Sequence, residues 1–194
     1  MNLIDRAKNI LLTPQKEWHV INSERGNVAN ITTTYILPLT LIGVLAAFIG
    51  FGFFGVGVGF FKIAGVGWGI KMALGYALRS IAGVFIMAFI IDAIATNFDS
   101  EKNFEKSFQV AAYSATAGLV GGIFLIIPML SILSILAGLY GLYLLYLGLP
   151  ILKKTPADKA VNYFVVVLVI AIIVNGILYF IQNLLFYPRI GIRI

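Results

Sequence analysis

The 194-residue chain contains no cysteine, and charged residues are scarce. Without cysteine the chain has no disulfide and no thiolate that could bind a metal or act as a nucleophile. Only 11% of its residues are charged and 60% are hydrophobic, whereas a soluble domain has about a quarter charged residues and about half apolar ones. The composition therefore predicts that lipid, not water, surrounds most of the chain.

Catalytic and metal-binding patterns are also missing. The single histidine, His19, has no cysteine or paired carboxylates beside it in the sequence, and a lone histidine is a weak metal-site signal. No serine has the glycine spacing of a nucleophile elbow, and no apolar run contains two carboxylates. We therefore expect no catalytic residue, no metal site and no cofactor, and we expect a protein that is not an enzyme.

A glycine-rich stretch, 50–69, matches a nucleotide-binding pattern in its letters only. Gly50, Gly52 and Gly55 have the spacing G-x-G-x-x-G, but that fingerprint functions in a strand-turn-helix unit. Here the stretch follows an apolar run and continues into more glycines, so we interpret it as a flexible connection at the membrane. The basic residues are scattered through short loops, which also argues against a nucleic-acid partner.

Five apolar runs are long enough to cross a bilayer as helices, which takes about 20 residues each. Four of them cover about 33–55, 71–95, 108–127 and 160–186, and the remaining one, between the third and the last, ends at Pro150 because proline interrupts helical hydrogen bonding. The predicted fold is all-α and polytopic. Its domains are an amphipathic N-terminal segment (1–32), a five-helix transmembrane domain (33–187) and a short tail (188–194).

The N-terminal segment is predicted to lie along the membrane surface. Apolar residues recur at helical spacing in 2–12, but the segment is too polar to span. Trp18 follows and suits the headgroup layer, where an amphipathic ring has water and lipid within reach.

The distribution of Lys and Arg predicts the orientation. With an odd number of spans the termini lie on opposite sides, and nine of the 14 basic residues then share the side of the N-terminus: Arg6, Lys8, Lys16, Arg25, Lys102, Lys106, Lys153, Lys154 and Lys159. The other side has Lys62, Lys71, Arg79, Arg189 and Arg193. Because cytoplasmic loops are enriched in Lys and Arg, we expect a multi-pass protein of a prokaryotic inner membrane with a cytoplasmic N-terminus and an opposite C-terminus.

Asp92 is an acidic residue within the second span, about one turn from its end. A carboxylate at the centre of a membrane helix costs about 2.5 to 3.5 kcal/mol on the insertion scale, and less near the interface. Asp92 is therefore either part of a proton or ligand site, or a structural residue paired with Lys102 or Lys106.

A second set of polar side chains lies within the spans. Tyr140, Tyr143 and Tyr146 are three residues apart and share a helical face. Together with Asp92, the candidate intramembrane site contains Tyr113, Tyr140, Tyr143, Tyr146 and Asn175. Gly118 and Gly122 allow close helix packing, either within one chain or between two copies.

The loop after Pro150 is the candidate contact surface. Lys153, Lys154 and Lys159 mark water there, and with Trp18 they form the predicted contact with lipid or with a protein partner. The expected partners are membrane lipids, and a homo-oligomer or another membrane protein.

Several stretches together resemble the small prokaryotic branch of the Yip1 family. They are LLTPQKEWHVI (11–21), YILPLTLIG (35–43), IIDAIATNFDSEKNFEKSFQVAAYSATAG (90–118) and LAGLYGLYLLYLGLPILKKTPADKAVNYFVVVLV (136–169). The resemblance implies five membrane helices and a cytoplasmic N-terminus, and it assigns no catalytic residue. Eukaryotic relatives act in vesicle traffic and bind Rab GTPases, but no residue here identifies a GTPase-binding surface. Ala117 stands near a position where the family commonly has proline.

Two functions are consistent with these patterns. The first is a non-enzymatic membrane organiser or scaffold that binds a protein or lipid partner, for which Asp92→Asn has little effect and neutralising the three loop lysines weakens association. The alternative is a small transporter or channel for an ion, a proton or a lipid-like molecule, built on convergence of Asp92, Tyr113, Asn175 and the tyrosine stripe.

Overall fold

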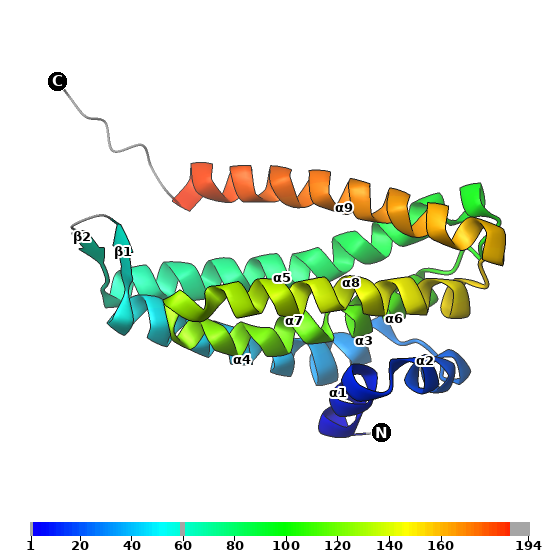
Figure 1. The fold of residues 1–194 in the computed structure, drawn as a ribbon, viewed down its shortest axis with the longest axis horizontal. Helices are drawn as coiled ribbons and strands as arrows, with labels where there is room; N and C mark the ends of the chain where they lie inside the picture. The colour runs from blue at the N-terminus through cyan, green and yellow to red at the C-terminus, as the bar shows by residue number, and fades with distance from the viewer. Residues whose placement is uncertain (1, 59–60, 187–194) are drawn as a thin grey trace.

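The computed structural model describes residues 2–58 and 61–186 as an elongated helical bundle with two short helices packed beside one end (Figure 1). Five helical stretches are long and apolar enough to cross a membrane: Val28–Phe54, Val66–Phe98, Phe104–Ile126, Pro128–Lys153 and Ala157–Ile177. The predicted all-α polytopic fold is therefore confirmed.

The N-terminal segment forms α1 (Leu3–Leu12) and α2 (Pro14–Ser23). The Asn2 side chain caps α1 by accepting a hydrogen bond from the Asp5 backbone N–H at 2.8 Å. Pro14 occupies the first position of α2, where its missing N–H costs no helical hydrogen bond. Both helices pack on the bundle (Figure 1), since Ile10 and Ile21 are fully buried.

The first span comprises α3 (Val28–Ile31), a π-helical turn (Thr32–Ile36), α4 (Leu37–Ile49) and a second π-helical turn (Gly50–Phe54). It begins five residues before the predicted start at 33, because the Asn27 side chain accepts from the Asn30 N–H at 2.8 Å and caps the helix there. The predicted boundary at 32 between the N-terminal segment and the spans thus falls inside a continuous helical stretch.

The described part of the glycine-rich stretch (50–58 and 61–69) has mostly regular secondary structure, where the sequence predicted a flexible connection. Its described part contains an antiparallel hairpin of β1 (Val56–Val58) and β2 (Phe61–Ile63). Gly55 turns the chain with a φ of 67°, a conformation that favours glycine. A Cβ at Gly50 would stand only 1.9 Å from the carbonyl oxygen of Leu125, so this glycine permits close backbone contact. The glycines of the G-x-G-x-x-G pattern therefore serve packing and turning.

The second and third spans differ from prediction at their ends and in their continuity. α5 (Val66–Ile94) starts ahead of 71 and continues as a 3₁₀ turn (Ala95–Phe98). The third span is broken into α6 (Phe104–Ser114), α7 (Thr116–Gly121) and a 3₁₀ turn (Gly122–Ile126). At the break, the Thr116 hydroxyl donates to the Tyr113 carbonyl at 2.7 Å, which competes with the helical backbone bond. The helix is thus interrupted without the proline common in the family.

A 3₁₀ turn (Pro128–Leu130) leads into α8 (Ser131–Lys153), and α9 (Ala157–Phe186) follows. α8 passes through Pro150 and ends one turn later than predicted. Proline removes a single hydrogen bond so close to the helix end, and the Lys153 carbonyl is held by the Glu101 N–H at 2.8 Å. The predicted tail, 188–194, lies outside the described residues.

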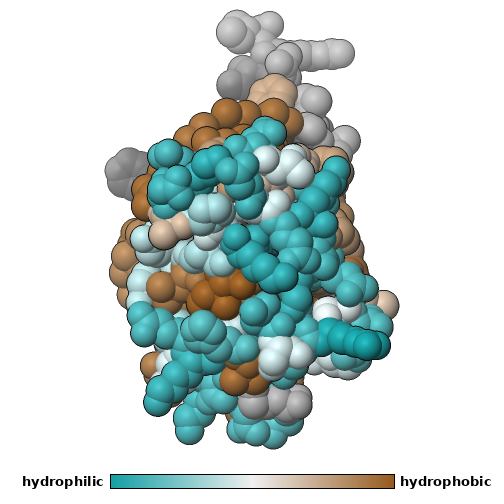
Figure 2. Space-filling view, turned by 90° about the vertical axis from the view of Figure 1, so that its right-hand side faces the viewer, coloured by the Kyte–Doolittle hydropathy of each residue, from teal (hydrophilic) through white to brown (hydrophobic). Residues whose placement is uncertain are grey.

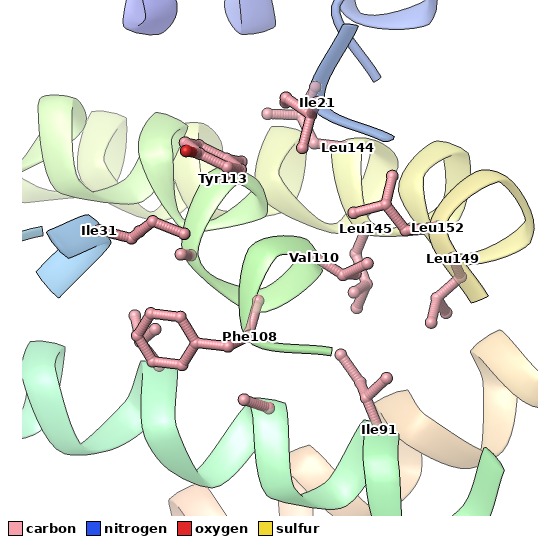
Figure 3. Packing of buried hydrophobic residues seen from close by; sticks show 14 of the residues in the cluster. Ile21, Ile31, Ile91, Phe108, Val110, Tyr113, Leu144, Leu145, Leu149 and Leu152 are labelled. Atoms are coloured by element: carbon pink, nitrogen blue, oxygen red, sulfur yellow. The ribbon is translucent and has the colours of Figure 1, made fainter. Parts of the chain in front are cut away.

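The apolar core lies where α5, α6, α8 and the N-terminal helices meet. Figure 3 shows Phe108 and Val110 of α6 between Ile91 of α5 and the leucines of α8. Phe108, Val110, Ile91 and these leucines are all fully or almost fully buried. α9 lies at one side of the bundle (Figure 1), and most of its apolar side chains are exposed to the surroundings, as a lipid-facing helix requires.

Candidate functional site

One end of the bundle is hydrophilic, and we call it the polar end face. It comprises α1, α2 and the loops 99–103 and 154–156 with the helix ends beside them, and Figure 2 shows this face as largely hydrophilic beneath the apolar surface of α9. All eight acidic side chains belong to these elements: Asp5, Glu17, Glu24, Asp92, Asp99, Glu101, Glu105 and Asp158. In the remainder of the bundle, all charged side chains are basic.

Asp92 belongs to a buried ion pair at this end. The Lys153 Nζ lies 3.3 Å from the Asp92 Oδ1, and the lysine side chain is 0% exposed against 15% for the aspartate. The Lys153 ammonium also donates to the Ser107 Oγ at 2.6 Å and to the Asn103 carbonyl at 3.0 Å. Ser107 in turn donates to Asp92 at 3.1 Å. Every group in this cluster therefore has a hydrogen-bond partner.

This geometry assigns Asp92 a partner other than the two predicted ones. Lys106 instead donates to the carbonyls of Asn22 and Glu24, at 2.7 and 3.2 Å, which ties α6 to the end of α2. The pairing with Lys153 depends on α8 running past Pro150, because the last helical turn places the lysine beside α5 and α6. The cluster joins α5 and α6, which follow one another in the sequence, to the distant end of α8.

Exposed ion pairs surround this cluster at the loop level. Lys154 pairs with Glu101 at 2.8 Å, and Lys159 pairs with Asp99. Ser100 donates to the Thr155 hydroxyl at 2.8 Å. The hydrogen bond from Lys154 lowers the pKa of Glu101, and the same bond raises the pKa of Lys154. The two loops are therefore bound to each other across the polar end face.

Arg6 joins α1 to α2. Its guanidinium donates to the Glu17 Oε1 at 2.6 Å and to the Glu24 Oε2 at 2.6 Å, and both Arg6 and Glu17 are buried. Burial alone would lower the pKa of Arg6, but the hydrogen bond to Glu24 and the nearby negative charges outweigh it and raise that pKa. The guanidinium also lies 5.3 Å from the centre of the Tyr113 ring, within cation–π range.

Trp18 and Tyr113 fill the space between the N-terminal helices and the bundle. The Trp18 side chain is 0% exposed, and a Cβ at Gly148 would stand 2.7 Å from its ring. Tyr113 has ring contacts with Trp18 and Tyr35, at centroid distances of 6.5 and 4.9 Å. The expectation of Trp18 in the headgroup layer is therefore wrong: the glycine on α8 leaves room for the indole inside the protein.

The other polar residues of the candidate intramembrane site are dispersed. The Tyr140 hydroxyl donates to the Leu11 carbonyl at 2.7 Å and anchors α1 on α8. Tyr143 and Tyr146 have exposed side chains on the α8 surface. The Asn175 side chain donates to Ala171, one turn earlier in α9, at 2.8 Å. The structure therefore does not bring these residues together with Asp92 in one cavity.

Of the four residues predicted to contact lipid or a partner, two are buried and two are exposed. Lys153 and Trp18 have no exposed side-chain surface, so they are internal packing residues and not surface contacts. Lys154 is 73% exposed and Lys159 is 38% exposed at the side chain, but each has an acidic partner within the chain. Within the described residues, no three of His, Cys, Asp and Glu come close enough to hold a metal ion.

Sequence reasoning missed one further feature, a groove of about 580 Å³ between α5, α6, α7, α8 and α9. Arg79, Ser114 and Asn175 are among its polar lining residues. Gly122 also lines the groove, and a Cβ there would stand 2.3 Å from the Tyr76 hydroxyl and 3.0 Å from the Gly43 Cα, so this glycine permits close packing within the chain. The sequence signal that was available for the groove is Arg79, a charged residue in the middle of an apolar run.

The fold and the polar end face define a multi-pass helical membrane protein with five spans and a hydrophilic cap at one end. The chain belongs to the Yip1 family, since the model of the Yip1 domain matches residues 8–178. It is 28% identical over 119 residues to the inner membrane protein YohC of Escherichia coli K12 and equally to that of strain CFT073. The match covers 60% of this chain and 61% of each relative. No solved structure matches the chain.

Proposed function

We propose that this protein is a non-enzymatic membrane organiser whose polar end face binds a cytoplasmic protein partner. The observation that carries the proposal is the use of its buried polar groups. Asp92, Lys153 and Ser107 bind one another, and Arg6 binds Glu17 and Glu24. These contacts hold the loops and the N-terminal helices together as one surface, as a scaffold requires. A group that carries protons would instead need to be free to bind and release them.

The charges of the polar end face favour a protein over an anionic membrane as the partner. Nine basic and eight acidic side chains belong to this end, and the loop lysines have carboxylate partners. A lipid surface of one sign attracts clusters of unpaired Lys and Arg. A mosaic of both signs is suited to a protein surface with its own complementary mosaic.

We also propose that the polar end face is cytoplasmic and that the C-terminus lies on the opposite side of the inner membrane. The inner membrane name of the Escherichia coli relatives and the excess of Lys and Arg at this end support that orientation. Because the chain has no cysteine, single cysteines at Lys8 and Lys71 report the topology. Impermeant maleimide should label Lys71→Cys in intact cells and Lys8→Cys only after lysis; the reverse pattern would refute the orientation.

A photo-crosslinking residue at position 154 in living cells tests the partner. We expect one discrete protein adduct that weakens when Lys102 and Lys159, on either side of the loops, are changed to Gln. The same crosslinker at Leu139, an exposed apolar position of α8, is the matched control and should give lipid adducts. Lipid adducts alone at position 154, or a protein adduct insensitive to the charge changes, would contradict the proposal.

The alternative of a transporter built on Asp92 has less support, because its carboxylate is occupied by Lys153 and the tyrosines do not face it. Proton flux into vesicles that contain the protein separates the two functions. The scaffold predicts the same flux for the wild type and for Asp92→Asn. A wild-type flux that Asp92→Asn abolishes would favour transport.

A further inference from the structure

The groove lies within the membrane-spanning half of the bundle, whose described residues include no acidic side chain. α5, α6, α7, α8 and α9 all contribute to its lining, which is mostly apolar. Its volume of about 580 Å³ lies within the usual range for a ligand site. Gly83 and Gly138 line it, and a Cβ at either glycine would meet no atom within 4 Å. The space beside these helices is therefore open to another molecule.

Arg79 brings a positive charge into this groove. It lies near the middle of α5, about 20 Å along the helix from Asp92, which is the nearest carboxylate in the sequence. In the part of the chain that the structure describes, no carboxylate forms an ion pair with Arg79. A charge within a membrane helix is costly and is retained beside a partner or a polar cavity. The described residues supply no acidic side chain at this depth.

Ser114 provides a second polar group without a partner. It is only 6% exposed and lines the groove, yet its hydroxyl has no hydrogen-bond partner within the described residues. A buried hydroxyl left unpaired is destabilising. The groove therefore lacks a hydrogen-bonding group as well as an anion.

The helix register places Asn175 beside Arg79 in depth. The Tyr163 hydroxyl on α9 donates to the Ile91 carbonyl on α5. From this contact the two antiparallel helices rise by equal amounts, about 18 Å, to Asn175 and to Arg79. The amide and the guanidinium thus lie at about the same level of the groove, where they can address one polar headgroup.

We propose that the groove binds an anionic glycerophospholipid of the leaflet opposite the polar end face, with its phosphate on Arg79 and an acyl chain along Gly83 and Gly138. The planar guanidinium binds phosphate with two parallel hydrogen bonds. In a helix, a side chain such as that of Arg79 leans toward the N-terminal end, which in α5 points away from the polar end face. This direction leads toward the headgroups of the opposite leaflet.

A second copy of the chain fits the groove less well. In a membrane, two copies with the same orientation have all their carboxylates at the polar end. A neighbouring copy therefore brings no acidic side chain to the depth of Arg79. The lipid supplies both the missing anion and an apolar chain, and its site is independent of the polar end face and of any partner bound there.

Native mass spectrometry of the full-length protein in detergent tests this site with dioleoyl phosphatidylglycerol and dioleoyl phosphatidylcholine as probes. We expect the wild type to prefer phosphatidylglycerol. Arg79→Gln should weaken that binding about tenfold or more, because a charge-assisted contact is lost. Lys71→Gln, an exposed cation on the same helix that does not line the groove, is the matched control and should have less than about a twofold effect.

A second variant tests the apolar part of the groove. Gly138→Leu adds a side chain into open space, so it should leave the thermal unfolding temperature unchanged or higher while weakening the binding of both lipids. The proposal is overturned if Arg79→Gln and Lys71→Gln have equal effects, or if Gly138→Leu retains lipid. It is also overturned if oleate binds Arg79 as tightly as phosphatidylglycerol, which would identify a free fatty acid as the occupant, or if binding is replaced by a dimer formed through this groove.

Discussion

The two ends of this bundle treat charge in opposite ways. At the polar end face, the buried cations Lys153 and Arg6 both have carboxylate partners within the chain. In the opposite half, Arg79 has none within the described residues, and the helices around it leave a groove. The first arrangement makes one end a self-contained structure, and the second leaves the other end incomplete without a molecule from the membrane.

The comparison teaches that a polar residue in a membrane span does not by itself indicate a transport path. Asp92 attracted attention as a carboxylate in an apolar run, but its hydrogen-bond partners explain it as a structural residue. The unbalanced group, Arg79, is the one whose surroundings require a ligand. Pairing within the chain therefore decides which charged residue is a site.

Lys153→Met is expected to have the largest effect on this comparison. It leaves Asp92 without its cation in a mostly buried place, and losing one partner of a buried pair costs about 3–5 kcal/mol of unfolding free energy. Unfolding in mixed micelles, followed by tryptophan fluorescence, measures the loss. Lys154→Met, at the exposed neighbouring position, should barely change the unfolding curve; equal effects of the two would show that the buried pair is not special.

Asp92→Asn removes the other charge of the same ion pair, and the structure changes the effect that we expect from it. The substitution was expected to have little effect in a scaffold, but the structure predicts a stability loss, since the buried Lys153 ammonium keeps only neutral acceptors. Partner binding should persist at temperatures below unfolding. Combining Asp92→Asn with Lys153→Met should cost less than the two single changes together, and full additivity would contradict the pairing.

Arg6→Gln should have the next largest effect, and it is confined to the N-terminal helices. Losing the bonds to Glu17 and Glu24 is expected to cost about 2 kcal/mol, in the range for hydrogen bonds to charged groups. Hydrogen exchange should then become faster in α1 and α2 and remain unchanged in α5. Lys8→Gln, an exposed change in the same helix, is the control, and faster exchange throughout the bundle would contradict a local role.

A pair of glycine substitutions compares the packing of the two ends. Gly148→Ala places a methyl group 2.7 Å from the Trp18 ring, and such overpacking costs about 1–3 kcal/mol. Gly138→Ala enters the open groove and should stabilise the helix by up to about 1 kcal/mol. Thermal unfolding of both variants in one detergent gives the comparison; a destabilised Gly138→Ala would show that the groove is closed.

The smallest expected effect is the pH dependence from the exposed pair of Glu101 and Lys154. Because the pKa of Glu101 is lowered in the folded protein, its contribution to stability is present above its unfolded pKa and is lost as the pH falls through the folded pKa. Glu101→Gln should therefore be slightly less stable than the wild type at neutral pH, where the pair is formed, and should lose less stability as the pH falls. Identical acid unfolding of the wild type and the variant would exclude this contribution.

The number of spans could be predicted from the sequence because apolar runs of sufficient length have few alternative structures in lipid. Side-chain partners could not, because they depend on how the helices are aligned in depth. Lys153 reaches Asp92 because α8 continues through Pro150. Trp18 can be buried because Gly148, which has no side chain, faces it. Proline usually ends a helix and tryptophan is enriched near membrane surfaces, and at both positions tertiary packing overrode the average preference.

The unpaired Arg79 also has an electrical consequence. The potential across an energised membrane does work on any net charge within it, about 2.3 kcal/mol for one elementary charge moved through 100 mV. The paired groups at the polar end largely cancel in that field, whereas Arg79 does not. If the polar end is cytoplasmic, the negative interior pulls the arginine inward. A phosphate held beside it would neutralise that force, so the groove's occupancy and the membrane voltage are coupled.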